Sequence, residues 1–489
     1  MNNQAPIMID ATTMYKWRDL DPVGIIRLER LLASHLRFGA DIGPVEYVLW
    51  DGGYRPVTQA EHDRLDLLLE PSPANGEVGD LPEDLDPTSA DDPVTPLVTA
   101  PLTRRRRVKS SVRTTGLKAL AKMPDHLRPF AEQAAWSSAT FAFESARHAR
   151  RVRADRKVGK STKKITGEQH IRHTVDFTRG GDLMAFGLGW EYLDHEALYK
   201  LKRDFGIRIH MPAFDLIPVT MPQMNAGQSH LVHRFYAEMA HYADSITSIS
   251  HATTDAIRSF YAREDLPTPY LATNQLPGFD PPNRHAEDKN RRRHRLQGEP
   301  FVLTVSTIEV RKNHLLLAKL WTDFAQRGVA VPRLVIVGKM GWDINELFQW
   351  VAHAPELDKY VTMFGDVEDD ELVEMYRACE FTVFPSRVEG WGLPITESLT
   401  YGKACIHAND PAQFEASQHL MPSLHPDDFL GWRDEIERMA LDIDYRQGLE
   451  TVIKEQFERR TPAEYCASFA TILADRRHIA TSTETEVAP

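Results

Sequence analysis

Short apolar runs alternate with helical patterns through residues 301–409, and this alternation restricts the possible fold more than any other feature of the sequence. The segments between the runs repeat their apolar residues at helical spacing. The runs are FVLTVST (301–307), PRLVIVG (332–338), YVTMFG (360–365), FTVFPS (381–386) and KACIHAN (403–409). Near-continuous apolar strands separated by helices predict a parallel sheet covered on both faces, which is a doubly wound α/β domain.

The stretch SRVEGWGLPITESL (386–399) leads from one of these strands into the next helix. Ligands of doubly wound domains bind beyond the carboxyl ends of the strands. Gly392 opens the helix and lets the backbone approach a ligand closely. Leu393 and Thr396 are expected to offer backbone N–H groups in the first turn, whereas Pro394 has none. These N–H groups and the positive end of the helix dipole predict an anion site suited to phosphate.

Two glutamates flank this predicted anion site. Glu389 precedes it, and Glu397 lies one turn into the helix. Carboxylates accept hydrogen bonds from hydroxyls, so a nucleotide-sugar, with a diphosphate between two sugars, would use all three features. A glutamate pair at this spacing also arises by chance, as an exposed residue and an ordinary first-turn helix residue. The residues at the end of the neighbouring strand favour the interpretation that the glutamates bind a ligand.

Two adjacent cations, Arg311 and Lys312, follow the first apolar run in the segment STIEVRKNH. Their position just past the carboxyl end of that strand lets them face the same crevice as the glutamate stretch. Two cations there can neutralise a departing diphosphate. The alternative is a solvated basic pair in a loop.

These segments resemble the retaining GT-B glycosyltransferases of family 4, also called glycosyl transferases group 1. The resemblance covers residues 300–410, in VLTVSTIEVRKNHLLLAKLW, LVIVGKMGW, MFGDVEDDELVEMYRACEFTVFPSRVEGWGLPITESL and GKACIHAND. It implies two Rossmann-like domains that face a cleft. It also implies that Glu389, the first Glu of the EX7E motif, contacts hydroxyls of the donor sugar, and that Glu397, the second, holds the ribose. Lys312 and Arg311 would bind the diphosphate, which Gly392 and Leu393 would meet through their backbone.

The resemblance extends to further positions. Gly338 and Lys339 end the second strand and would line the same crevice, and Val367 matches a loop that often contacts the base. Many relatives have Gly-Arg where this chain has Ser306-Thr307, so the positive charge depends more heavily on Arg311 and Lys312.

The N-terminal half is expected to form a second Rossmann-like domain over residues 1–290, with a disordered or basic insertion at about 65–170. Gly24 opens a helix (24–39), where it either admits the acceptor or relieves packing. Asp215, in FDLIP, follows a strand, and the resemblance implies that it lies near the acceptor and the reacting centre. Many relatives have a His where this chain has Phe214. The donor domain is expected at 291–435, helices that return to the first domain at 436–478, and a polar tail at 479–489.

The expected insertion is divided by charge. Residues 59–92 are acidic and rich in Pro and Gly, which predicts disorder. Residues 101–164 contain 18 Lys or Arg against 4 Asp or Glu. This basic part is either a solvated arm or a contact with an anionic membrane surface or a diphosphate substrate. No motif for nucleic acid accompanies it.

Composition indicates a soluble, cytoplasmic protein, with peripheral membrane contact as an option. The 3 cysteines have no metal-ligand spacing, and no signal peptide or membrane span is visible. No cofactor is expected besides the nucleotide-sugar substrate. No metal is expected either, because the Asp-X-Asp matches at Asp19-Asp21 and Asp442-Asp444 lie outside strand ends.

The sequence therefore predicts a retaining glycosyltransferase that moves a sugar from a nucleotide diphosphate donor to a hydroxyl acceptor, a saccharide or a lipid-linked saccharide. Mannose or rhamnose transfer in polysaccharide or glycolipid synthesis is the reading that the resemblance favours. A nucleotide-sugar epimerase of the same fold and a non-catalytic scaffold subunit are the alternatives. The base, the linkage and the oligomeric state are open.

Overall fold

The computed structural model describes residues 5–69 and 174–485, apart from gaps at 19–23, 40–42, 188, 190–192, 226, 228, 279–295, 297 and 366. The chain divides into one compact unit made of residues 1–71 and 168–489, and a second made of residues 72–167. The second unit holds most of the expected insertion. The proposed contact of its basic part with a membrane or a diphosphate therefore lies outside the described residues.

The N-terminal half of the first unit contains a seven-stranded sheet in the order β3-β2-β1-β4-β5-β6-β7. Its strands are parallel except for the antiparallel pair β2 and β3 at one edge. The strands are β1 (Ile7–Asp10), β2 (Val45–Trp50), β3 (Tyr54–Pro56), β4 (Asp182–Met184), β5 (Arg208–Ala213), β6 (Ser245–Ser248) and β7 (Tyr270–Thr273). Strands β1, β4 and β6 are buried along their whole length, as expected for a parallel sheet covered on both faces.

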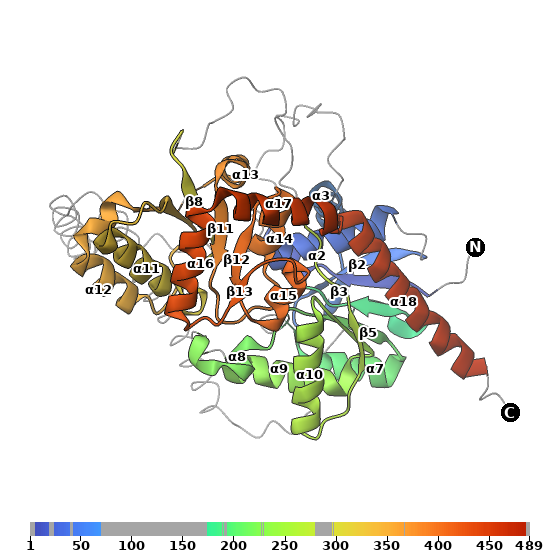
Figure 1. The fold of residues 1–489 in the computed structure, drawn as a ribbon. Coiled ribbons are helices and arrows are strands. Elements are labelled where there is room, and N and C mark those ends of the chain that lie inside the picture. Colours follow the sequence, from blue (N-terminus) through green and yellow to red (C-terminus); the bar gives the residue numbers. More distant parts are fainter. Residues whose placement is uncertain are drawn as a thin grey trace, which may run out of the picture. The chain divides into compact units, whose positions relative to one another are not determined.

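Local sequence signals set the bounds of the helices in this half. For example, Asp194 caps α7 by accepting from the Ala197 N–H at 3.0 Å, and Gly206 ends that helix in the left-handed conformation. In Figure 1, α9 and α10 lie below the sheet. The helices are α1 (Thr12–Lys16), α2 (Gly24–Ser34), α3 (Gln59–Leu69), α7 (His195–Phe205), α8 (Ile217–Thr220), α9 (Ser229–Tyr242) and α10 (His251–Arg263), with short turns η1 (His35–Gly39), η2 (Phe177–Arg179) and η3 (Pro222–Met224).

The C-terminal half contains a six-stranded sheet, parallel throughout, in the order β10-β9-β8-β11-β12-β13. Its strands are β8 (Phe301–Val305), β9 (Arg333–Val337), β10 (Val361–Phe364), β11 (Phe381–Phe384), β12 (Cys405–Ala408) and β13 (Ser423–Leu424). They alternate with η4 (Val310–Lys312), α11 (His314–Arg327), α12 (Asn345–His353), η5 (Pro355–Lys359), α13 (Asp369–Ala378), α14 (Leu393–Thr400) and α15 (Pro411–Ser417). The predicted class, two doubly wound α/β domains, is confirmed.

One expected boundary is wrong. The acidic stretch from residue 59 and the insertion from about residue 65 were expected to lie outside the core, but α3 continues to Leu69 with Leu65 and Leu69 buried. These two leucines at the end of the helix pack into the hydrophobic core. The last helix continues to Thr485, into the expected polar tail at 479–489.

Three helices, α16 (Phe429–Leu441), α17 (Ile443–Gln456) and α18 (Pro462–Thr485), follow the second sheet. The last of them, α18, contacts the N-terminal half. Phe469 of this helix packs edge-on against Phe186, with ring centroids 5.6 Å apart, and the Tyr465 carbonyl accepts from Asn274 at 3.1 Å.

A buried ion cluster also joins α18 to the first sheet. Asp182, on β4, is fully buried and accepts from Arg208 at 2.7 and 2.8 Å, from Arg477 of α18 at 3.1 Å and from His210 at 3.0 Å. Burial would raise the pKa of Asp182, but His210 and Arg208 lower it to about 2. The cluster lies at the start of β4, away from the carboxyl ends of the strands, which indicates a structural role.

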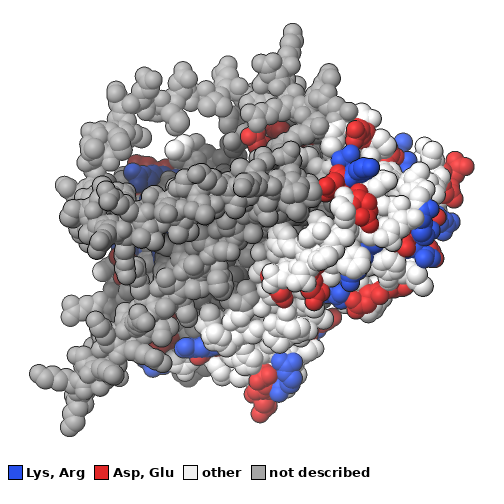
Figure 2. Space-filling model, turned by 90° about the vertical axis from the view of Figure 1, so that its left-hand side faces the viewer, with Lys and Arg blue, Asp and Glu red and all other residues white. Residues whose placement is uncertain are grey.

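On the face shown in Figure 2, acidic and basic side chains of the described residues are interspersed. Among these residues, no helix combines the length and apolar character that a bilayer crossing requires.

Candidate active site

The segment between β8 and α11 places Arg311 and Lys312 at the carboxyl end of β8. Both residues belong to the short turn η4, and Asn313 then adopts the left-handed conformation, φ 59°, to start α11. The Asn313 side chain donates to the Pro426 carbonyl at 2.9 Å, which fixes this turn. The two cations are only 18% and 12% exposed. They are therefore held in place and do not form a solvated pair.

Glu389 lies between these two cations. Its Oε2 accepts from Arg311 Nη1 at 2.8 Å, and its Oε1 accepts from Lys312 and from the Ser386 hydroxyl. Burial would raise the pKa of Glu389, but Lys312 and Arg311 lower it to about 2. A second carboxylate, Glu309, pairs with Arg311 at 2.9 Å. The predicted cations and the first predicted glutamate thus form one ionised cluster.

Asp215, from the N-terminal half, adjoins this cluster. It follows β5 directly, and its Oδ1 accepts from the Ile217 N–H at 2.9 Å. Burial raises the pKa of Asp215, and the charges of Arg311, Glu389 and Lys312 also act on it. A Cβ atom added to Gly390 would lie 2.3 Å from the Phe214 carbonyl oxygen. The structure therefore brings together all four predicted catalytic residues.

The start of α14 follows the expected pattern with one exception. Gly392 has φ 127°, a conformation that favours glycine, and Leu393 is the first helical residue, so its N–H points out of the helix end. The Thr396 N–H was expected to be free as well, but it donates to the Gly392 carbonyl at 3.3 Å. That prediction is wrong because Thr396 already lies within the helical hydrogen-bond pattern.

Glu397 lies one turn into α14, as predicted. Its Oε2 accepts from the Tyr376 hydroxyl at 2.7 Å. Burial raises the pKa of Glu397 to about 7, although Tyr376 and Arg27 favour the ionised form. In contrast to Glu389, this carboxyl group titrates near neutrality.

The other predicted donor-site positions differ in their surroundings. Gly338 ends β9, and a Cβ atom there would lie 1.9 Å from the Ser306 carbonyl oxygen, so only glycine fits. Lys339 beside it is exposed. Val367 packs against a hydrophobic cluster that includes Phe301 and Val335. Gly24 is the first residue of α2 and borders residues outside the described part of the chain.

Sequence reasoning missed two residues that support Glu389. Asp410 caps α15 by accepting from the Gln413 N–H at 3.3 Å, and it also accepts from the Glu389 N–H. Burial and the Glu389 charge raise the pKa of Asp410 to about 7. Gln413 donates to the Ser386 carbonyl at 2.7 Å. The Asp-Pro pair directly after the run KACIHAN is a helix-start signal that could have identified Asp410.

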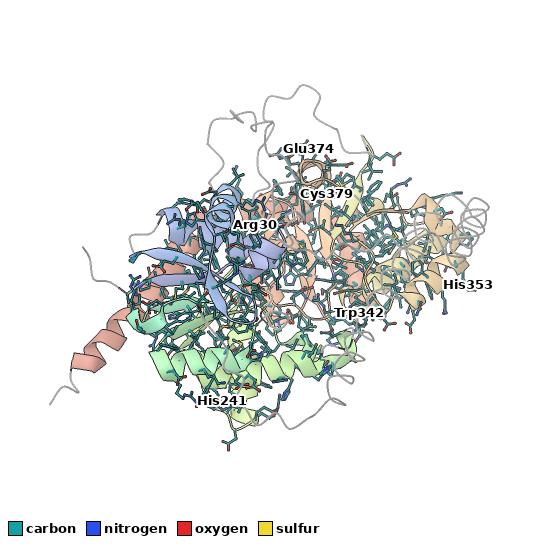
Figure 3. The ribbon with its side chains drawn as sticks, turned by 180° about the vertical axis from the view of Figure 1, so that it is seen from behind. Arg30, His241, Trp342, His353, Glu374 and Cys379 are labelled. Atoms are coloured by element: carbon teal, nitrogen blue, oxygen red, sulfur yellow. The ribbon has the colours of Figure 1, made fainter. Side chains whose placement is uncertain are left out.

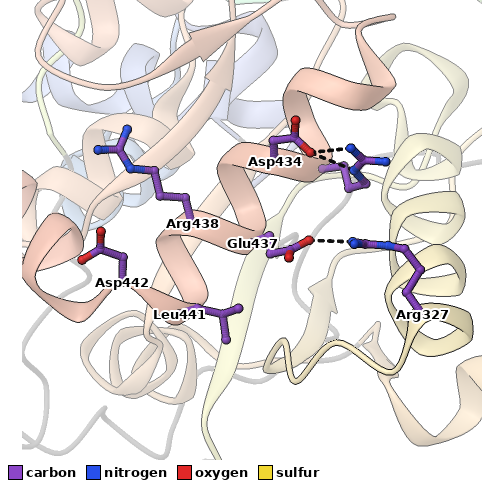
Figure 4. Close-up of a pocket in the computed structure, with 7 residues that line it drawn as sticks. Arg327, Asp434, Glu437, Arg438, Leu441 and Asp442 are labelled. Carbon is purple, nitrogen blue, oxygen red and sulfur yellow. Dashed lines mark hydrogen bonds and ion pairs between the residues drawn. The ribbon is translucent and has the colours of Figure 1, made fainter.

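Two hollows border other described residues. Figure 4 shows an open one of about 540 Å³ lined by Arg327, Arg433, Asp434, Glu437, Arg438, Leu441 and Asp442. Its charges compensate one another, since Arg327 pairs with Glu437 at 2.6 Å and Arg433 with Asp434 at 2.7 Å. A second, of about 380 Å³, is lined in part by Trp391 and Thr396 of the glutamate stretch. Of the residues predicted for the site, Thr396 lines this second hollow, and Arg311, Lys312, Glu389 and Glu397 line neither.

Within the described part of the chain, no group of three His, Cys, Asp or Glu side chains is arranged to hold a metal ion. Asp442, from one Asp-X-Asp match, caps α17 by accepting from the Tyr445 N–H at 2.9 Å. Asp19 and Asp21 lie outside the described residues.

Comparison with known proteins agrees with the resemblance. Residues 286–420, which carry Arg311, Lys312, Glu389 and Glu397, match the family model of the glycosyl transferases group 1. This segment is therefore similar to the glycosyl transferases group 1.

Curated proteins that are similar to part of this chain include two enzymes of Escherichia coli. The serotype-specific mannosyltransferase WbdA is 24% identical over 214 residues, which is 42% of this chain and 26% of WbdA. O-antigen chain mannosyltransferase B is 27% identical over 158 residues, which is 29% of this chain and 40% of that protein. The match thus spans only about a quarter of WbdA's length.

One solved structure aligns with nearly the whole chain. HepE of Anabaena, crystallised with UDP and glucose, has a TM-score of 0.50 and 12% sequence identity, with 96% of this chain and 99% of HepE covered. At this identity the likeness shows the shared GT-B fold.

Proposed function

We propose that the protein is a retaining glycosyltransferase that moves a sugar from a nucleotide diphosphate donor to a hydroxyl acceptor. The observation that carries the proposal is the cluster of Arg311, Lys312 and Glu389 at the carboxyl end of the second sheet. Positive charge for a diphosphate and carboxylate oxygens for hydroxyls meet there, beside the N-terminus of α14.

In this proposal Arg311 and Lys312 stabilise the departing diphosphate as the bond between the anomeric carbon and the diphosphate oxygen breaks. The acceptor hydroxyl attacks the anomeric carbon on the same face, and its proton passes to the leaving diphosphate oxygen. Glu389 orients the donor sugar, and Glu397 accepts hydrogen bonds from the ribose. Asp215 lies close enough to influence the acceptor side of the reaction.

The relatives support a narrower substrate. Two E. coli proteins that are similar to part of this chain are mannosyltransferases, and one of them acts on O-antigen chains. We therefore favour mannose as the donor sugar and a growing polysaccharide as the acceptor. The sequence alone left mannose and rhamnose open.

The test is to incubate the protein with nucleotide-sugars, with and without saccharide acceptors, and to measure free nucleotide diphosphate and the anomeric configuration of the product. Transfer with retention supports the proposal. An epimerase would convert the donor without releasing nucleotide diphosphate, and a scaffold subunit would leave it unchanged. Inversion at the anomeric carbon would contradict the retaining mechanism.

We expect chelation of divalent metal ions to leave the transfer rate within about twofold of the untreated rate. The reason is that two protein cations already occupy the position where a diphosphate needs positive charge. The measurement compares initial rates in excess EDTA and after Mg²⁺ or Mn²⁺ is restored. A loss of more than tenfold that metal restores would contradict this expectation.

A further inference from the structure

Tyr376 contacts Glu397 through a hydrogen bond. It belongs to α13, is 2% exposed, and its hydroxyl donates to Glu397 Oε2 at 2.7 Å. Its ring stacks on Tyr401, with centroids 5.6 Å apart and planes at 21°. Figure 3 labels Glu374 on this helix and Cys379, the residue that follows it, and Cys379 is buried like Tyr376. The tyrosine therefore has a fixed position and a single direction for its hydroxyl.

The hydrogen bond leaves Glu397 with free acceptor capacity. An ionised carboxylate has about four lone-pair sites, and Tyr376 uses one of them on Oε2. The vicinal hydroxyls of a ribose present two donors, which a carboxylate of fixed orientation can accept together. Without the tyrosine hydroxyl, the Glu397 side chain would keep its place on α14 but lose the contact that sets its plane.

The charged groups that face Glu397 oppose each other. Arg27 of α2 favours the ionised carboxylate, and Asp369, at the start of α13, disfavours it. These two residues also pair with each other at 3.0 Å, and both are about half exposed. Their effects on the pKa of Glu397 therefore have opposite signs. Burial and the Tyr376 hydrogen bond are the larger influences on this pKa.

We propose that Tyr376 is a positioning residue whose hydroxyl fixes the Glu397 carboxylate so that it accepts the ribose hydroxyls of a bound nucleotide. This inference rests on the proposed function, because it assumes that the site takes a nucleotide. Tyr376 itself does not touch the ligand. Its role is to keep Glu397 oriented and to favour its ionised form.

The test uses Tyr376→Phe, Glu397→Gln and the double variant. The probe is whichever of UDP, GDP, ADP or dTDP binds the wild type, and its affinity is measured by calorimetry from pH 5.5 to 8.5. Tyr376→Phe should weaken binding about tenfold at pH 7, since a hydrogen bond to a charged group is lost. The lost hydrogen bond favoured the ionised form, so the pKa of Glu397 rises. The pH at which affinity is half-maximal should then move upward, which a purely structural role would not cause.

In the Glu397→Gln background, Tyr376→Phe should change the affinity less than twofold, because the partner charge is already absent. Tyr445→Phe is the matched control, since the hydroxyl of Tyr445, on α17, donates to Glu435, on α16, at 2.7 Å. It should leave both affinity and pH dependence unchanged. Thermal midpoints verify that every variant is folded.

Two results would overturn this inference but not the proposed function. One is a Tyr376→Phe variant with the affinity and pH dependence of the wild type. The other is a loss of nucleotide affinity on Tyr376→Phe that is equally large in the wild type and in the Glu397→Gln background. If no nucleotide binds the wild type, the proposed function itself fails and the inference fails with it.

Discussion

Replacement of Lys312 by methionine is expected to lower the rate of sugar transfer about 10²–10³-fold. Loss of one preorganised charge at a position where charge develops typically has an effect of about this size. Lys312 is held against Glu389 and its ammonium lies 5.3 Å from the Phe384 ring centroid, so its charge has a fixed position. The measurement is the initial rate at saturating donor, compared with the wild type.

Lys319→Met is the control for this variant, because Lys319 is a lysine of α11 whose ammonium lies over the Trp350 ring, 5.3 Å from its centroid. Its rate should stay within twofold of the wild type. Lys312→Arg should retain more activity than Lys312→Met, since it restores the charge with altered geometry. A Lys312→Met protein that is folded and transfers sugar at the wild-type rate would exclude a diphosphate role for Lys312.

Asp182→Asn is expected to lower the free energy of unfolding by about 3–5 kcal/mol, the usual effect of removing one partner from a buried ion pair. Arg208, Arg477 and His210 would lose the carboxylate that they share. Asp204→Asn is the control, because Asp204 pairs only with its neighbour Arg203 at the surface, where such pairs contribute little. Urea unfolding of both variants measures the difference.

The same cluster predicts a pH dependence of stability. The pKa of Asp182 is depressed from its ordinary value of 3.8 to about 2, so its stabilisation is present above pH 3.8 and is lost as the pH falls through about 2. This contribution is about 2 kcal/mol. The stability of the wild type should therefore fall more steeply than that of Asp182→Asn across this range. Parallel curves for the two proteins would contradict the prediction.

The second domain and its site positions were predictable because they follow from local patterns. The alternation of apolar runs and helices gives the strand ends, and Arg311, Glu389 and Asp215 each lie in the segment that follows a strand. Parallel strands place their carboxyl ends at one edge of the sheet. The neighbourhood of Arg311, Lys312 and Glu389 could therefore be inferred from the sequence.

The pairing within that neighbourhood could not be inferred. Sequence reasoning assigned the cations to the diphosphate and Glu389 to the donor sugar, whereas the structure joins all three side chains. Asp410 and Tyr376 reach Glu389 and Glu397 from other elements, and no spacing in the sequence indicates such contacts. The length of α3 was missed because its acidic composition resembles that of the stretch after it.

The most direct test of the account is a thermal-shift measurement with UDP, GDP, ADP, dTDP and their sugars on the wild type, Glu397→Ala and the control Glu374→Ala. A ligand that binds only the folded state stabilises it by about 2.7 kcal/mol at 100 times its Kd. The account predicts that one nucleotide raises the melting temperature of the wild type and of Glu374→Ala, and raises that of Glu397→Ala far less. No shift with any nucleotide, or equal shifts in all three proteins, would contradict a nucleotide-sugar site at Glu397.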